Sequence, residues 1–145
     1  MSKADDAAAV FQGGCNCTQA VLSVFAGDFG LDNTTAIKIA TGFGGGIGHS
    51  GETCGAVNGA VMVISLRSGL SLEKTYFSNQ KVYDIVGWMM DEFKKRNGSV
   101  RCLDLIGVDF SNAESYREAL RKNVFYTTCS KFVRDAVEIV EEIYK

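Results

Sequence analysis

Apolar residues recur at three- and four-residue steps along most of the chain, and this spacing predicts helices. In the segment that begins at Cys17, one face carries Cys17, Ala20, Val21, Val24 and Phe25. The expected helices cover residues 4–12, 17–25, 32–40, 56–66, 71–96, 111–122 and 127–143, with a short turn at 99–107. No segment alternates polar and apolar residues for long enough to indicate a strand. The pattern therefore predicts an all-α protein.

The segment 56–66 is apolar on nearly every side, since it contains Val57, Ala60, Val61, Met62, Val63 and Ile64. A helix that is apolar all round is normally buried, so we expect this one to be central and fully surrounded. About a dozen apolar residues are too few to span a bilayer. We expect residues 1–145 to form a single-domain bundle of about six or seven helices around this segment.

Helix-capping residues precede four of the five cysteines. The expected N-caps are Asn16, Thr53, Ser99 and either Thr127 or Thr128. These caps place Cys17, Cys54, Cys102 and Cys129 in the first turn of their helices. Free amide groups and the positive end of the helix dipole favour an anion there, so we expect lowered thiol pKa values. Four helix N-termini that converge could stabilise a cluster of thiolates.

Composition narrows the range of functions. The chain has 145 residues, of which 46% are hydrophobic and 22% charged, with a net charge of -2. These values indicate one folded domain and argue against a nucleic-acid-binding surface. The first residues lack the apolar core of a signal peptide, so we expect a cytoplasmic protein without a membrane segment. In a reducing compartment, five cysteines are more typical of metal binding, catalysis or redox sensing than of structural disulfides.

The densest run of glycine lies at residues 41–59, TGFGGGIGHSGETCGAVNG. Glycine at this density is expected where the backbone needs a positive φ or a close approach. We therefore predict that backbone N–H donation or close approach to a cofactor involves Gly44, Gly45, Gly46 and Gly48. The run lacks the Gly-Lys-Ser/Thr of a P-loop and no strand precedes it, which makes a nucleotide site the weaker hypothesis. The glycines are better explained by the need to hold Cys54 at a helix start.

The loop also contains the single histidine, His49, and a nearby carboxylate, Glu52. His49 could carry protons or serve as a fifth metal ligand, with Glu52 orienting its ring. The alternative is an exposed loop histidine beside an ordinary acidic residue at a helix N-terminus. The polar surroundings favour this alternative.

Four features stand out together: NCTQAVL around Cys17, ATGFGGGIG before His49, ETCGAVNGA around Cys54, and the later Cys102 and Cys129. In their order and spacing they resemble the C-GCAxxG-C-C family of redox-active proteins. The resemblance extends from about Gly14 to the end of the chain, although the Gly-Cys-Ala order of the family name appears here as Cys-Gly-Ala. Cys15 lies outside the pattern. The resemblance implies a small helical protein of bacteria or archaea with cysteine-based redox chemistry.

Three hypotheses remain open. The first, which we prefer, is an iron–sulfur cluster or similar metal bound by Cys17, Cys54, Cys102 and Cys129, because soft thiolates suit such metals. The second is a reversible dithiol/disulfide couple, with Cys17 and Cys54 as the first candidate pair and catalytic residues. The third is a non-redox module that binds an anion or nucleotide through the glycine loop. The sequence leaves open whether the protein is an oxidoreductase or an electron carrier.

The expected partner is an unidentified redox protein rather than a nucleic acid or a membrane. Trp88, Met89 and Met90 on the long helix also offer a contact surface for a homodimer.

Overall fold

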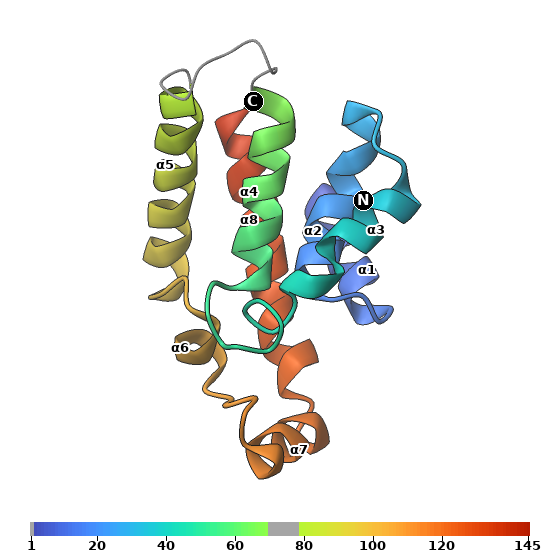
Figure 1. The fold of residues 1–145 in the computed structure, drawn as a ribbon, viewed down its shortest axis with the longest axis vertical. Helices are drawn as coiled ribbons and strands as arrows, with labels where there is room; N and C mark the ends of the chain where they lie inside the picture. The colour runs from blue at the N-terminus through green and yellow to red at the C-terminus, as the bar shows by residue number, and fades with distance from the viewer. Residues whose placement is uncertain (1, 70–78) are drawn as a thin grey trace.

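The computed structural model describes residues 2–69 and 79–145. Within these ranges the chain forms an all-α bundle without strands, as predicted (Figure 1). The described part contains eight α-helices rather than the expected six or seven, because the turn at 102–106 is itself a short helix. The helices are α1 (Lys3–Gln12), α2 (Cys17–Ala26), α3 (Asn33–Ala40), α4 (Gly55–Ser68), α5 (Gln80–Asn97), α6 (Cys102–Ile106), α7 (Ala113–Arg121) and α8 (Ser130–Ile143).

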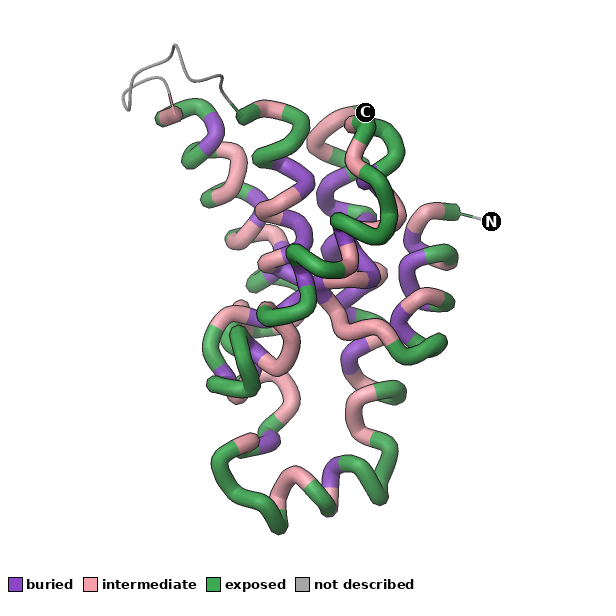
Figure 2. Tube along the Cα trace, turned by 45° about the vertical axis from the view of Figure 1, so that its right-hand side comes forward, coloured by how far each residue is buried: buried purple, intermediate pink, exposed green. Residues whose placement is uncertain are grey.

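Two helices, α4 and α8, share the centre of the bundle. Helix α8 packs against α1, α2, α4 and α5, while α4 packs against α2, α5 and α8. Burial concentrates where these helices meet (Figure 2). The expectation that residues 56–66 are fully surrounded is wrong, because Val61 and Met62 are only partly buried and Leu66 is 41% exposed. Helix α8 covers one side of α4 and leaves its outer side partly open.

Close helix packing between α2 and α4 depends on small residues. A Cβ on Gly59 would lie 2.8 Å from Val21 Cβ, and one on Gly55 would lie 2.9 Å from Thr18 Oγ1. The fully buried Thr18 hydroxyl donates a 2.8 Å hydrogen bond to the Gly55 carbonyl. This contact fixes the start of α4 against the start of α2. None of the helices among the described residues has both the length and the apolar character needed to cross a bilayer.

The predicted start of α2 is confirmed in detail. Asn16 accepts a hydrogen bond from the Gln19 amide, and the Gln19 side chain accepts one from the Asn16 amide, which completes a capping box. The same two side chains donate to the Thr41 carbonyl and the Thr41 hydroxyl, respectively. Asp32 caps α3 through the Thr35 amide, also as expected. The cap of α2 therefore also connects it to the end of α3.

Three other helix starts differ from the prediction. Cys54 itself, rather than Thr53, is the N-cap of α4, and Arg101 rather than Ser99 is the N-cap of α6. Thr127 and Thr128 cap nothing, because the chain is already helical in a π-turn, η4 (Phe125–Cys129), that continues directly into α8. The expected start of the long helix at Ser71 lies outside the described residues.

An isolated antiparallel bridge connects the start of α4 with the start of α6. Thr53 pairs with Arg101, the Cys54 amide donates to the Val100 carbonyl at 2.8 Å, and the Cys102 amide donates to the Glu52 carbonyl at 2.6 Å. This pairing joins segments about fifty residues apart and brings Cys54 and Cys102 to one place. It is too short to be recognised as strand in the sequence.

Candidate functional site

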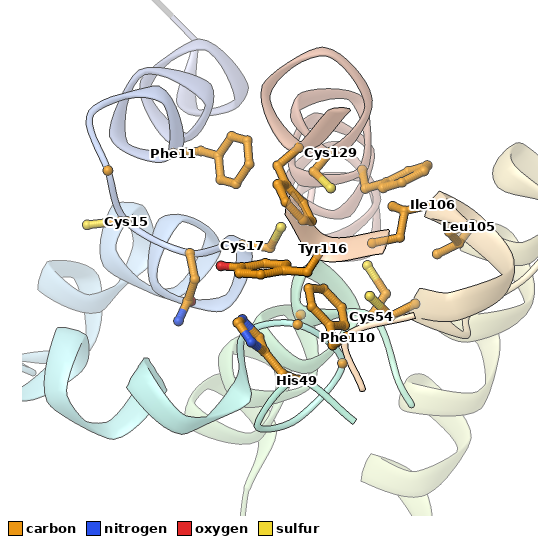
Figure 3. A pocket seen from close by; sticks show the side chains of 18 residues that line it. Phe11, Cys15, Cys17, His49, Cys54, Leu105, Ile106, Phe110, Tyr116 and Cys129 are labelled. Atoms are coloured by element: carbon orange, nitrogen blue, oxygen red, sulfur yellow. The ribbon is translucent and has the colours of Figure 1, made fainter. Parts of the chain in front are cut away.

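A cavity of about 270 Å³ lies where the starts of α2, α4 and α6 meet η4. All five cysteines and His49 line it, together with Phe11, Phe110, Tyr116, Phe125 and Phe132. Figure 3 shows the labelled sulfurs of Cys17, Cys54 and Cys129 around this space, whereas the Cys15 side chain points away from them. The four cysteines singled out from the sequence thus lie around one cavity. The sequence missed Cys15 and the aromatic wall, because no local pattern connects them to the loop.

Different backbone features place the four sulfurs. Cys17 is the first residue of α2, Cys54 is the N-cap of α4, and Cys102 is the first residue of α6. Cys129 ends the π-turn before α8, inside a continuous helix. The prediction of four converging helix N-termini is therefore correct for three cysteines and wrong for Cys129. A π-turn inserts an extra residue and often marks a functional site.

Burial outweighs the helix dipole for two of these thiols. Desolvation raises the pKa of Cys54 to about 11, although the Ala56 and Val57 amides point towards its sulfur and offset part of the rise. Desolvation also raises the pKa of Cys102 to about 12. The expected lowering of thiol pKa by helix starts does not occur at these positions. Both groups are thiols rather than thiolates at neutral pH.

Cys17 and Cys129 are neighbouring thiols in the wall of the cavity, and each affects the ionisation of the other. The Cys129 side chain raises the pKa of Cys17 well above its ordinary value, and the Cys17 thiol lowers the pKa of Cys129. Burial raises the pKa of Cys17 further, and the charges of Cys129, Cys54 and Cys102 act in the same direction. The lowered pKa of Cys129 is therefore caused by a neighbouring thiol and not by a helix N-terminus.

The glycine loop forms a left-handed turn against the cysteines. Residues 45–49 all have positive φ, between 59° and 71°, and they include the non-glycine residues Ile47 and His49. A Cβ on Gly46 would lie 2.7 Å from Cys102 Cβ and 2.6 Å from the Glu52 amide nitrogen. The loop backbone thus approaches Cys102 closely at this position, whereas the sequence predicted a close approach to Cys54.

The four glycines singled out from the sequence do not share one role. Gly45 and Gly46 line the cavity, whereas Gly44 and Gly48 do not. Gly44 instead packs against the side chain of Asn16, where a Cβ would approach Nδ2 to 2.7 Å. Nothing lies within 4 Å of a Cβ on Gly48, so glycine is favoured there only by the φ of +59°. Whether any of the four donates an N–H to a cofactor stays a prediction.

His49 belongs to an aromatic wall of the cavity. Its ring stacks on Phe110 with centroids 4.3 Å apart, and Tyr116 lies 5.5 Å from it. Phe125 completes the cluster, since its ring is 5.9 Å from that of Phe110. Glu52 does not orient the imidazole in the way considered from the sequence. Its carboxylate lies 4.0 Å from the Arg101 guanidinium at the exposed surface.

The sulfurs surround the cavity rather than meet at one point. Among residues 2–69 and 79–145, no group of three or more His, Cys, Asp or Glu side chains is arranged to hold a metal ion. The side chains therefore do not fit a single-ion site such as tetrahedral zinc. In a [4Fe–4S] cluster each of the four cysteines binds a different iron, so the sulfurs need not meet at one point. All five cysteines are free thiols.

Comparison with known proteins connects this cavity to a family. No curated protein and no solved structure is significantly similar to the chain. A family model does match residues 15–143, a range that begins at Cys15 and includes every residue that lines the cavity except Phe11 and Gly14. The resemblance noted in the sequence is thereby confirmed. The chain belongs to the C_GCAxxG_C_C family, which is described as putative redox-active protein.

Proposed function

We propose that the protein is a thiol–disulfide redox protein in which Cys129 attacks and Cys17 resolves. The observation that supports this most is that both thiols line one cavity, where Cys17 lowers the pKa of Cys129 and Cys129 raises the pKa of Cys17. A thiolate is the attacking species in disulfide exchange, and a neighbouring thiol completes it. The pair differs from the first candidate pair, Cys17 with Cys54, because Cys129 affects the pKa of Cys17 more strongly than Cys54 does.

The reaction balances with a disulfide as oxidant. The Cys129 thiolate attacks one sulfur of R–S–S–R′, forms a mixed disulfide and releases R′S⁻. The Cys17 thiol gives its proton to R′S⁻, and its sulfur then attacks Cys129 Sγ, which releases RS⁻. That thiolate takes up the proton that Cys129 lost before the first step. Two electrons pass from the two cysteines to the substrate, and a second dithiol, in a partner protein, reverses the change.

Cys54 and Cys102 have a different part in this proposal. With pKa values of about 11 and 12, both stay protonated while Cys129 reacts. Their sulfurs line the cavity and keep its surface uncharged. They are therefore positioned to surround the reacting pair rather than to attack.

An iron–sulfur cluster held by Cys17, Cys54, Cys102 and Cys129 is the second candidate. One observation favours it: four elements far apart in sequence bring four sulfurs to one cavity. The charges of Cys54, Cys102 and Cys129 all raise the pKa of Cys17. Three thiols with raised pKa values would need a strongly positive group to ionise together, and iron supplies that charge. The glycine loop would then approach the cluster through Gly45 and Gly46.

Thiol counting after mild oxidation tests the first proposal. The reduced protein has five free thiols, and oxidation should remove two, with the Cys17–Cys129 linkage identified by peptide mapping. Cys17→Ser and Cys129→Ser should each prevent the loss of the pair. Cys15→Ser is the matched control, since this side chain points away from the other sulfurs, and it should still lose two thiols. A linkage between other cysteines, or no loss at all, would contradict the assignment.

Metal analysis distinguishes the second candidate. Protein purified without oxygen should carry stoichiometric iron and visible charge-transfer absorption if the four cysteines hold a cluster. Each of the four Cys→Ser variants should then lose iron, whereas Cys15→Ser should keep it. A colourless, iron-free protein with an oxidisable pair leaves the dithiol proposal as the better one.

A further inference from the structure

The cavity that holds the reacting pair has no charged side chain in its wall. Its eighteen lining residues are glycine, cysteine, asparagine, histidine, leucine, isoleucine, phenylalanine and tyrosine, without Asp, Glu, Lys or Arg. Glu52 on the glycine loop and Arg101 at the start of α6 have side chains 63% and 46% exposed and lie beside each other at the surface. Apart from the reacting Cys129 sulfur itself, a charged substrate would find no counter-ion in this cavity.

The wall of the cavity is also largely shielded from water. Cys54, Cys102 and Cys129 are only 4%, 8% and 7% exposed. The effective penalty for burying an unpaired ion is several kcal/mol, and a charge on a substrate meets the same surroundings. The volume of about 270 Å³ is below the range of roughly 300–1,000 Å³ that holds drug-sized ligands.

We propose that the substrate of the Cys129–Cys17 pair is a small uncharged disulfide, and this inference rests on the thiol–disulfide function proposed above. The substrate enters between the aromatic wall of His49, Phe110 and Tyr116 and the sulfurs. Cys129 takes one half of the disulfide, Cys17 displaces it, and the two halves leave as neutral thiols. Protonation of the leaving thiolates keeps the cavity uncharged at the end of the reaction.

Three disulfides of nearly equal size test the role of charge. Bis(2-hydroxyethyl) disulfide is neutral, cystamine carries two positive charges, and 3,3′-dithiodipropionate carries two negative charges. The rate at which each oxidises the reduced, full-length protein is divided by its rate with 2-mercaptoethanol, which removes differences in intrinsic reactivity. The normalised rate should be at least about tenfold higher for the neutral disulfide than for either charged one, because burying an ion costs several kcal/mol. Equal normalised rates would overturn the inference.

A charge added to the wall provides a second measurement. Ile106 lines the cavity and is partly exposed, so the aliphatic part of a lysine there can pack against the wall while its ammonium group stays hydrated. Ile106→Lys should shift the preference from the neutral towards the anionic disulfide, whereas the matched Ile106→Gln should keep the wild-type order. Because the ratio is measured within each variant, a general loss of rate does not affect it. An unchanged ratio in Ile106→Lys would contradict the role of the uncharged wall.

A strong general oxidant separates failure of this inference from failure of the proposed function. Diamide should form the Cys17–Cys129 disulfide whatever the natural substrate is. If diamide forms the linkage but the neutral disulfide has no advantage, only the substrate class is wrong. If diamide leaves the pair reduced, the thiol–disulfide function fails and the substrate class fails with it.

Discussion

Gly46 tests whether the glycine loop exists to bring backbone and cysteine together. Its φ is +70°, and an added Cβ would lie 2.6 Å from the Glu52 amide nitrogen, 2.7 Å from Cys102 Cβ and 2.8 Å from the Gly51 carbonyl carbon. Two of these three atoms are backbone and cannot move aside as a flexible side chain can. Gly46→Ala should therefore force the loop away from the bridge that holds Cys54 and Cys102.

Gly48 provides the matched control. It has a φ of +59°, but nothing lies within 4 Å of an added Cβ. Gly48→Ala should lower the free energy of unfolding by about 1–2 kcal/mol, because alanine is strained at a positive φ where glycine is not. Gly46→Ala should lower it by the same amount and by about 1–3 kcal/mol more, because the added Cβ also overpacks the site. The difference between the two variants isolates the close approach.

Urea unfolding of both variants under reducing conditions measures the difference, and the rate of alkylation of Cys102 measures its effect at the site. Cys102 should become more reactive in Gly46→Ala than in Gly48→Ala, because displacement of the loop exposes its sulfur and lowers its pKa towards the ordinary value. If Gly46→Ala is no less stable than Gly48→Ala and Cys102 is unchanged, the close approach has no energetic role and the reasoning is refuted.

Three further predictions concern the sulfurs and the helix start that supports them. Cys17→Ala should raise the pKa of Cys129 above that in wild type, seen as a higher inflection in its pH–alkylation profile, while Cys17→Ser should keep part of the effect because a hydroxyl also donates. Thr18→Val should cost about 0.5–1.5 kcal/mol in chemical denaturation by removing the buried hydrogen bond from the Thr18 hydroxyl to the Gly55 carbonyl, and Thr18→Ser should recover most of it. Because burial raises the pKa of Cys54 to about 11, the unfolded protein loses this proton at lower pH than the folded protein does. The contribution of Cys54 to the free energy of unfolding is therefore complete below about pH 9 and lost as the pH rises through about 11. Between these limits the free energy of unfolding of wild type should fall by about 3 kcal/mol more than that of Cys54→Ala.

Much of the fold could be predicted from the sequence because helix information is local. The capping box of Asn16 and Gln19, the cap at Asp32 and the stop at Asn97-Gly98 each depend on residues a few positions apart. The same locality explains the errors. Thr53 and Thr127 look like caps, yet the bridge makes Cys54 the cap of α4 and the π-turn continues the helix through Cys129.

The sequence by itself determined that the chain is helical and that its four cysteines and glycine loop match a family described as redox-active. Only the tertiary structure decided which thiols lie around one cavity and in which direction burial and neighbours shift the pKa values of Cys17, Cys54, Cys102 and Cys129. Pairing of Cys17 with Cys129 requires contact between residues more than a hundred positions apart, which no periodicity encodes. Ionisation depends on burial as well as on position along a helix. Desolvation in the cavity therefore raised the pKa of Cys54 and Cys102, where helix starts alone predicted a decrease.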